Sequence, residues 1–175
     1  MPTRRVATGT TPDGRSFVAL DELLEPVTVS ALPGYAWYKL WGFDEPPSDP
    51  ADAVMSKDQS HFPPRGGARF NIFTVPPASM ARPPLTPEAQ HELDQKLPGR
   101  TTRMGSDQAG MHRTASVDLI LVLAGRISLE LDDGALVHLQ AGDTLVQNGT
   151  RHAWRNSSDE PCTLAIVLLG TDPSA

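Results

Sequence analysis

The sequence has very little cysteine and no long apolar run, and each shortage excludes a class of protein. Cys162 is the single cysteine in 175 residues, so an intramolecular disulfide and a cysteine-based metal site are both excluded. We expect Cys162 to be a small core residue of a strand. No apolar run approaches the roughly 18 residues of a membrane span, and the N-terminus lacks the apolar segment of a signal peptide. A cytoplasmic protein without a membrane partner is therefore expected.

Positive charge is also scarce. Fifteen Lys and Arg residues stand against 21 Asp and Glu residues, which gives a formal net charge of −6. Phosphate binding needs clustered Lys and Arg, and the nearest cluster, Arg4 and Arg5, lies near the N-terminus. The charge balance therefore argues against a nucleic-acid partner. The apolar fraction of 39% is ordinary for a globular protein.

Proline is almost absent from the second half of the chain. Fifteen of the 17 prolines lie at or before Pro98. Proline removes a backbone donor and is excluded from central strands. We therefore predict a single domain over residues 1–175, with an N-terminal arm and loops over 1–64 and a β-barrel over 65–171.

The residue pattern predicts an all-β fold with one short helix near residues 87–97. Thr86 is suited to be its N-cap, and Pro87 fits the first helical position. The run 117–123 is apolar and β-branched, which is typical of a strand buried on both faces. Short strands separated by turn signals indicate a sandwich or barrel. The expected strands are 4–8, 16–20, 35–41, 69–75, 117–123, 127–131, 135–139, 144–147, 152–156 and 163–169.

Two polar clusters in the second half carry the residues suited to chemistry. On a strand, His112, Thr114 and Asp118 share one face together with Ser116. A polar face directly before the apolar run 119–123 indicates a pocket. The second cluster contains His152, and Trp154 and Asn156 share its face.

The two clusters resemble the paired motifs of the cupin superfamily. The first motif there reads His-x-His, then Glu, then Gly, and its positions fall here on His112, Thr114, Asp118 and Gly125. The second motif is a series of Gly, Gly, His and Asn at fixed intervals. Its positions fall here on Gly142, Gly149, His152 and Asn156. The resemblance implies one double-stranded β-helix, also called a jelly-roll barrel. The whole chain is also similar to a subgroup of small single-domain cupins, some of which are associated with polyketide tailoring.

The departures from the family pattern leave two hypotheses open. The resemblance implies a divalent metal such as Zn, Fe, Ni or Mn held by His112, Asp118 and His152, a two-His-one-carboxylate set. However, Thr114 replaces the second His of the motif, and Asp118 is one methylene shorter than the usual Glu. The alternative is a metal-free pocket in which the two imidazoles act as general acid and base or bind the substrate.

Four further residues are candidates for substrate binding. Thr114, Gln147 and Trp154 lie in or beside the motifs, and Arg69 could project inward as the partner of an anion. We expect His61 to be exposed, because it lies in a Pro-rich loop.

These observations predict a small-molecule enzyme that acts on a polyketide-like or organic-acid substrate in the barrel. A dehydratase, a decarboxylase and an isomerase all fit, whereas a dioxygenase fits only with iron. The alternative is a non-catalytic module that binds a small molecule. The resemblance also implies a homodimer formed through N-terminal strands.

Overall fold

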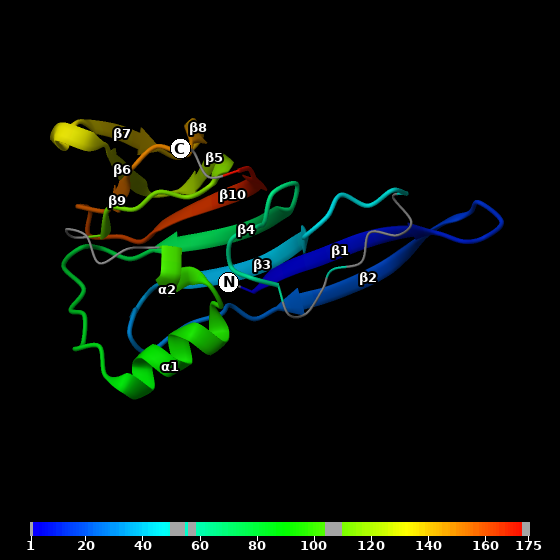
Figure 1. Ribbon diagram of the computed structural model, residues 1–175, viewed down its shortest axis with the longest axis horizontal. Coiled ribbons are helices and arrows are strands. Elements are labelled where there is room, and N and C mark those ends of the chain that lie inside the picture. Colours follow the sequence, from blue (N-terminus) through cyan, green and yellow to red (C-terminus); the bar gives the residue numbers. More distant parts are fainter. Residues whose placement is uncertain (1, 50–54, 56–58, 104–109, 173–175) are drawn as a thin grey trace.

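The computed structural model describes residues 2–49, 55, 59–103 and 110–172. In this part of the chain, a five-stranded sheet of order β3-β4-β10-β5-β8 accompanies a three-stranded sheet of order β7-β6-β9, and β1 and β2 form a separate hairpin. Figure 1 shows the sheets together and the helices beside them. The strands are β1 Thr3–Thr10, β2 Ser16–Leu24, β3 Ala36–Phe43, β4 Ala68–Val75, β5 Ser116–Ala124, β6 Arg126–Glu130, β7 Leu136–Gln140, β8 Thr144–Asn148, β9 Ala153–Arg155 and β10 Cys162–Gly170. The helices are α1 Pro87–Lys96, α2 Arg100–Arg103 and a 3-10 turn at Asp132–Gly134. The predicted all-β class is confirmed.

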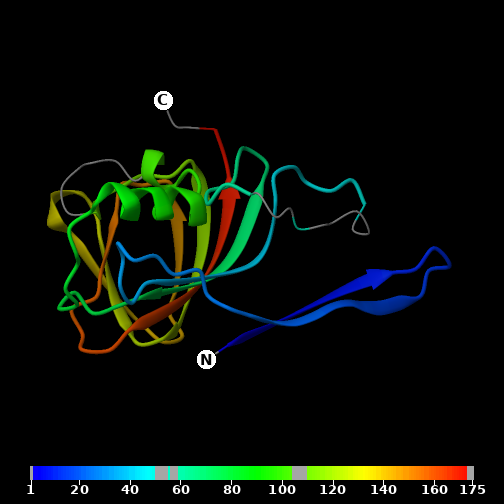
Figure 2. The same cartoon turned by 90° about the horizontal axis from the view of Figure 1, so that it is seen from below.

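The hairpin β1-β2 is an arm that projects away from the barrel (Figure 2). Its anchor is Arg5, whose Nη1 donates to the carbonyl oxygen of Leu40 in β3 at 3.0 Å. Apolar side chains remain exposed along the arm, including Val6 and Val18. The N-terminal arm predicted from the sequence is therefore present as a two-stranded ribbon.

Strand β3 lies within residues 1–64, the range predicted as arm and loops, yet it belongs to the five-stranded sheet. It pairs with β4 in antiparallel register from Ala36 opposite Thr74 to Phe43 opposite Ala68. The barrel therefore takes an edge strand from the proline-rich half. Proline-free sequence over residues 35–45 makes this pairing possible.

Helix α1 lies against β3 and confirms the predicted helix. Thr86 Oγ1 accepts a hydrogen bond from the Ala89 backbone nitrogen at 3.2 Å, as an N-cap does. Leu93 and the fully buried Leu97 pack against Trp37 of β3. The helix thereby positions α2, which begins three residues after Leu97, beside the same tryptophan.

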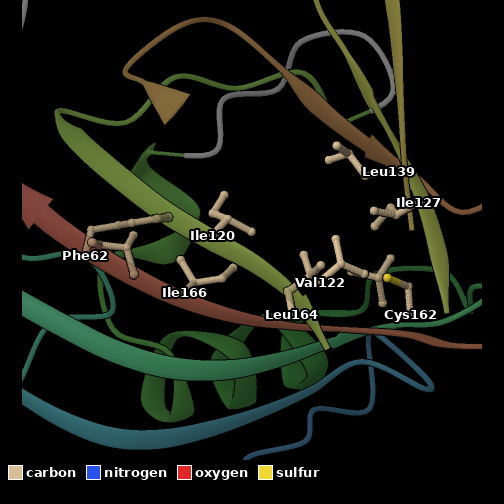
Figure 3. Packing of buried hydrophobic residues seen from close by; sticks show 10 residues of the cluster. Phe62, Ile120, Val122, Ile127, Leu139, Cys162, Leu164 and Ile166 are labelled. Atoms are coloured by element: carbon tan, nitrogen blue, oxygen red, sulfur yellow. The ribbon is translucent and has the colours of Figure 1, made fainter. Parts of the chain in front are cut away.

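The apolar core fills the space between the two sheets (Figure 3). Leu164 and Cys162 of β10 are completely buried, and they meet Val122 of β5 and Ile127 of β6 in one cluster. Burial raises the pKa of the Cys162 thiol to about 11, so this residue is a core residue and not a nucleophile. The prediction for Cys162 is confirmed.

The prediction that residues 117–123 are buried on both faces is wrong. In β5, Ile120 and Val122 are buried, whereas Leu119, Leu121 and Leu123 are 44%, 39% and 44% exposed. One face of the strand lines the barrel interior and the other faces outward. The outward face is nevertheless apolar, which is why the run resembles a doubly buried strand.

Candidate functional site: a paired-imidazole pocket

His112 and His152 are brought together by their own backbones. Each residue donates its backbone N–H to the carbonyl oxygen of the other at 2.9 Å, forming an isolated antiparallel bridge. In such a pair the two side chains project to the same side. The ring centroids are accordingly 4.4 Å apart. His112 precedes β5 of the five-stranded sheet and His152 precedes β9 of the three-stranded sheet, so the bridge joins the two sheets at one end.

The hydrogen bonds of the two rings leave the Nε2 atoms for a ligand. His112 Nδ1 lies 3.0 Å from the Gly110 carbonyl oxygen, which only accepts, so the neutral ring carries its proton on Nδ1. His152 Nδ1 lies 2.9 Å from the Thr150 carbonyl oxygen and 2.8 Å from the Gln147 Nε2. With a proton on Nδ1 this ring donates to Thr150, and without it the ring accepts from Gln147. His152 can therefore hold its proton on either nitrogen.

Both imidazoles are neutral at neutral pH. Burial and the neighbouring His112 together lower the pKa of His152 from 6.5 to about 4, against the bond to Thr150, which raises it. Burial also lowers the pKa of His112, as does the positive charge of Arg100, while the bond to Gly110 acts in the opposite direction. A neutral imidazole offers a lone pair, so the site holds a potential proton acceptor above these pKa values.

Asp118 is a buried carboxyl at the end of a hydroxyl ladder. The Ser116 hydroxyl donates to Asp118 Oδ1 at 2.6 Å and lies 3.0 Å from Thr114 Oγ1. Burial raises the pKa of Asp118 to about 6, against the bond from Ser116, which lowers it. The predicted polar face of 112, 114, 116 and 118 is thus real, and part of it is satisfied internally by hydrogen bonds.

The three predicted metal ligands do not form a metal-holding group. Among the described residues, no three His, Cys, Asp or Glu side chains are arranged to hold a metal ion. Asp118 accepts a hydrogen bond from Ser116, and the position of the second family histidine is occupied by Thr114. The residues present therefore fit a pair of imidazoles and not the set of His112, Asp118 and His152.

The imidazole pair opens into a cavity of about 140 Å³, which limits a ligand to a small molecule. Both sheets, the loops and α2 contribute to its wall, which is aromatic on one side and polar on the other. The lining residues are Leu32, Tyr35, Trp37, His61, Phe62, Asn71, Phe73, Arg82, Arg100, Gly110, His112, Thr114, Asp118, Ile120, His152, Trp154, Arg155, Ile166 and Leu168.

Of the four predicted substrate-binding residues, two lie in the cavity wall and two lie outside it. Thr114 and Trp154 line the cavity. Gln147 is buried beneath His152 and reaches the site only through that ring. Arg69 does not project into the cavity, because its guanidinium pairs with Asp44 and donates to backbone carbonyls, including that of Phe43 at 2.7 Å.

The sequence analysis missed the contribution of the first half to this pocket. His61, expected to be exposed, is partly buried in the wall, and burial lowers its pKa to about 3. Trp37 and Phe73 come from β3 and β4, and Arg100 comes from α2. The alternation of aromatic residues around Trp37 was a visible signal of a strand, but it did not indicate which face would turn inward.

Two antiparallel sheets that enclose a small cavity at one end form a barrel. Residues 101–168 match the family model described as "Cupin domain", so this segment is a cupin domain, as the motifs predict.

Several known proteins match part of this chain. A phomopsin biosynthesis cluster protein C' of Diaporthe leptostromiformis is 54% identical over 48 residues, which are 27% of this chain and 25% of that protein. A cupin-domain-containing oxidoreductase, srdB, of Neurospora crassa is 34% identical over 67 residues, 38% of this chain and 34% of that protein. The matches therefore span about a quarter to a third of these relatives. The crystal structure of the DMSP lyase DddQ of Ruegeria pomeroyi has a TM-score of 0.46 and 15% identity, covering 85% of this chain and 53% of that chain.

No helix in the described ranges is both long enough and apolar enough to span a membrane.

Proposed function

We propose that this protein catalyses a proton transfer on a small organic acid, as in a dehydration, a decarboxylation or an isomerisation. The observation that carries the proposal is the pair of neutral imidazoles, with ring centroids 4.4 Å apart, at the wall of a cavity that has both aromatic and polar lining residues. Strongly lowered pKa values at the wall of a cavity are characteristic of catalytic groups.

The hydrogen bonds assign different roles to the two rings. His112 holds its proton on Nδ1 against Gly110, so its Nε2 is the proton acceptor. His152 carries its proton on Nε2 when Gln147 donates to its Nδ1, so this Nε2–H is a hydrogen-bond donor to the substrate. A proton passes from the substrate to His112 Nε2, which later returns it to the product or to the departing oxygen, while the Nε2–H of His152 donates a hydrogen bond to the oxygen that gains negative charge. Gln147 is a positioning residue in this scheme.

The names of the relatives support small-molecule chemistry. The Diaporthe relative belongs by its name to a biosynthesis cluster, and the Neurospora relative is named an oxidoreductase. A tailoring step on a polyketide-like acid agrees with the first name. The second name favours the rival, a divalent metal such as Fe, Zn, Ni or Mn bound at the two imidazoles. Metal analysis of protein purified without chelator separates the two, because a stoichiometric metal contradicts the metal-free scheme.

The proposal is tested by incubating the protein in D2O with a panel of β-hydroxy, β-keto and unsaturated acids. NMR then records loss of water, loss of carbon dioxide or uptake of deuterium. We expect turnover of at least one acid, abolished in the double variant His112→Gln with His152→Gln. The exposed His91→Gln is the matched control and should retain full turnover. Equal turnover in the double variant, or none across the panel by the wild type, contradicts the proposal and favours a binding module.

We also propose a homodimer formed through the outer face of the five-stranded sheet. Leu119, Leu121 and Leu123 of β5 and Val146 of β8 are exposed on strands that pair directly. Contiguous apolar surface of this kind marks an interface. The occupant is a second copy, because the projecting hairpin of the same chain supplies exposed apolar side chains that can cover it (Figure 2).

Light scattering on a sizing column tests this interface. We expect a dimeric wild type and a monomer for Leu121→Lys, whereas Leu136→Lys, at an exposed leucine of β7, stays dimeric. Deletion of residues 1–30 should leave a monomer or insoluble protein. A dimer that survives both changes refutes the interface.

A further inference from the structure

The cavity holds more positive charge than its own carboxyl can balance. Three arginines line it, against Asp118 as the one carboxyl in the lining that the structure describes. Arg155 is paired with Glu130 outside the lining. Arg82 donates to the Tyr35 hydroxyl at 2.7 Å, a neutral partner. Arg82 is exposed to water, whereas Arg100, the third arginine of the lining, is partly buried.

Arg100 is a partly buried cation that lies over the ring of Trp37. Its guanidinium carbon lies 5.6 Å from the centroid of the Trp37 ring, and that ring is only 4% exposed. Leu93 and Leu97 pack against Trp37 in one apolar cluster. Within residues 2–49, 55, 59–103 and 110–172, no carboxylate forms an ion pair with Arg100. A cation withdrawn from water without a counter-charge is unfavourable, and an anionic ligand relieves that cost.

The charge of Arg100 reaches the imidazoles. After burial, it is the largest cause of the lowered pKa of His61, and it also lowers the pKa of His112. Arg100, His112 and His152 line the same cavity of about 140 Å³, so a small molecule bound at Arg100 can also contact the paired rings.

Part of the cavity wall is a group of nearly parallel aromatic rings, Tyr35, Trp37 and Phe73. Tyr35, Trp37 and Phe73 are stacked with centroid distances of 5.9 Å, 5.9 Å and 5.2 Å and interplanar angles of 13°, 25° and 22°. Such a surface suits a planar, unsaturated body better than a branched aliphatic one.

We propose that Arg100, assisted by Arg82, binds the carboxylate of a small planar unsaturated or aromatic acid, whose body lies on the Tyr35-Trp37-Phe73 wall and whose far end meets His112 and His152. This inference rests on the proposed function for the identity of the site, and it adds the substrate class. A guanidinium fork matches a carboxylate through two parallel hydrogen bonds, which gives orientation as well as affinity.

The experiment compares benzoate with benzamide, which has the same shape and no charge. Each is titrated by calorimetry into the wild type, Arg100→Gln, Arg113→Gln and the double variant His112→Gln with His152→Gln. Arg113 is the matched control, because it is exposed and stands between His112 and Thr114 on the opposite face of the chain. Circular dichroism confirms that each variant is folded.

We expect the wild type and Arg113→Gln to bind benzoate at least tenfold more tightly than benzamide, and Arg100→Gln to lose most of this preference. Arg82→Gln should lower the preference by a smaller factor. The double histidine variant keeps the preference, so the anion site is tested separately from catalysis. A wild type without preference for benzoate, or an Arg100→Gln variant that keeps it, overturns the inference. If the preference holds and no acid is turned over, the anion site stands and the proposed function fails.

Discussion

The two ends of the barrel interior are built on the same strand faces and have opposite chemistry. On β5, the inward face carries Asp118 at the cavity end and Val122 at the other. On β10, Leu168 lines the cavity, whereas Leu164 is sealed in the core (Figure 3). A shift of four residues along one strand therefore separates a polar pocket from a dry core.

The protein accepts an energetic cost at the cavity end and not at the sealed end. At the sealed end every side chain in the cluster is apolar or a neutral thiol. At the cavity end, burial raises the pKa of Asp118 and lowers the pKa of His152, so the folded state disfavours the charged form of each. Groups held against their preferred ionisation are typical of functional sites and not of structural ones.

The largest effect expected at the cavity end is on catalysis. Replacing His112 and His152 together with Gln removes the proton acceptor and the hydrogen-bond donor, and general acid–base catalysis alone typically contributes 10²- to 10⁴-fold. We expect turnover to fall by at least about 100-fold, with a melting temperature close to that of the wild type. A rate loss that is matched by a loss of folded protein would mean that the rings serve the core and not the reaction.

The largest effect expected at the sealed end is on stability. Leu164 is completely buried, so Leu164→Ala leaves a cavity and should lower the free energy of unfolding by about 3 kcal/mol. Denaturant unfolding measures this value. At the cavity end, Thr114→Ala removes a side chain that borders open space, and its cost should be clearly smaller. Equal costs at both ends would contradict the contrast.

The cavity end should also control how stability depends on pH. The pKa of His152 is about 4 when folded and near 6.5 when unfolded, so the unfolded chain binds more protons between these values. Stability is therefore present above pH 6.5 and is lost as pH falls towards 4. His152→Gln should remove up to about 3 kcal/mol of that loss. Unfolding of both proteins at several pH values measures it, and parallel profiles would refute the assignment.

Asp118 is expected to have the opposite effect on how the free energy of unfolding changes with pH. Its folded pKa of about 6 lies above the ordinary 3.8, so the folded chain binds more protons between these values. Its contribution to stability is full below pH 3.8 and is lost as pH rises through 6. Asp118→Asn should therefore be more stable than the wild type above pH 6. A destabilised variant would show that the carboxylate has a charged partner at neutral pH.

The elements that the sequence predicted well are those with local signals. Helix α1 follows from Thr86 and Pro87, and the strand pattern follows from alternation and turn residues. The spacing of the family motifs predicted that His112 and His152 face each other. The structure shows that a backbone bridge between the two residues brings their rings together. Each of these depends on a short stretch or on a motif interval.

The elements that could not be predicted depend on contacts between distant segments. Arg100 reaches the cavity because Leu97 packs on Trp37, a contact that spans 60 residues and has no pattern of its own. His61 is drawn inward in the same way, towards the Trp37 ring at 6.2 Å. Leu121 was misassigned because an apolar residue on an outer face looks the same in sequence as one inside the barrel.

The smallest expected effect is a gain of metal binding at the cavity end. Thr114 stands where the family motif has its second histidine, and its side chain lines the cavity. Thr114→His should complete a set of three imidazoles with His112 and His152, the ligand type that divalent transition metals prefer. We expect Thr114→His to bind Co²⁺ about tenfold more tightly than the wild type does, as measured by the visible absorption of the ion.

His91→Gln in the same background is the control and should leave the gain intact. Unchanged Co²⁺ affinity in Thr114→His would show that the two rings are directed away from position 114, and that the imidazole pair cannot be extended into a metal site from that strand.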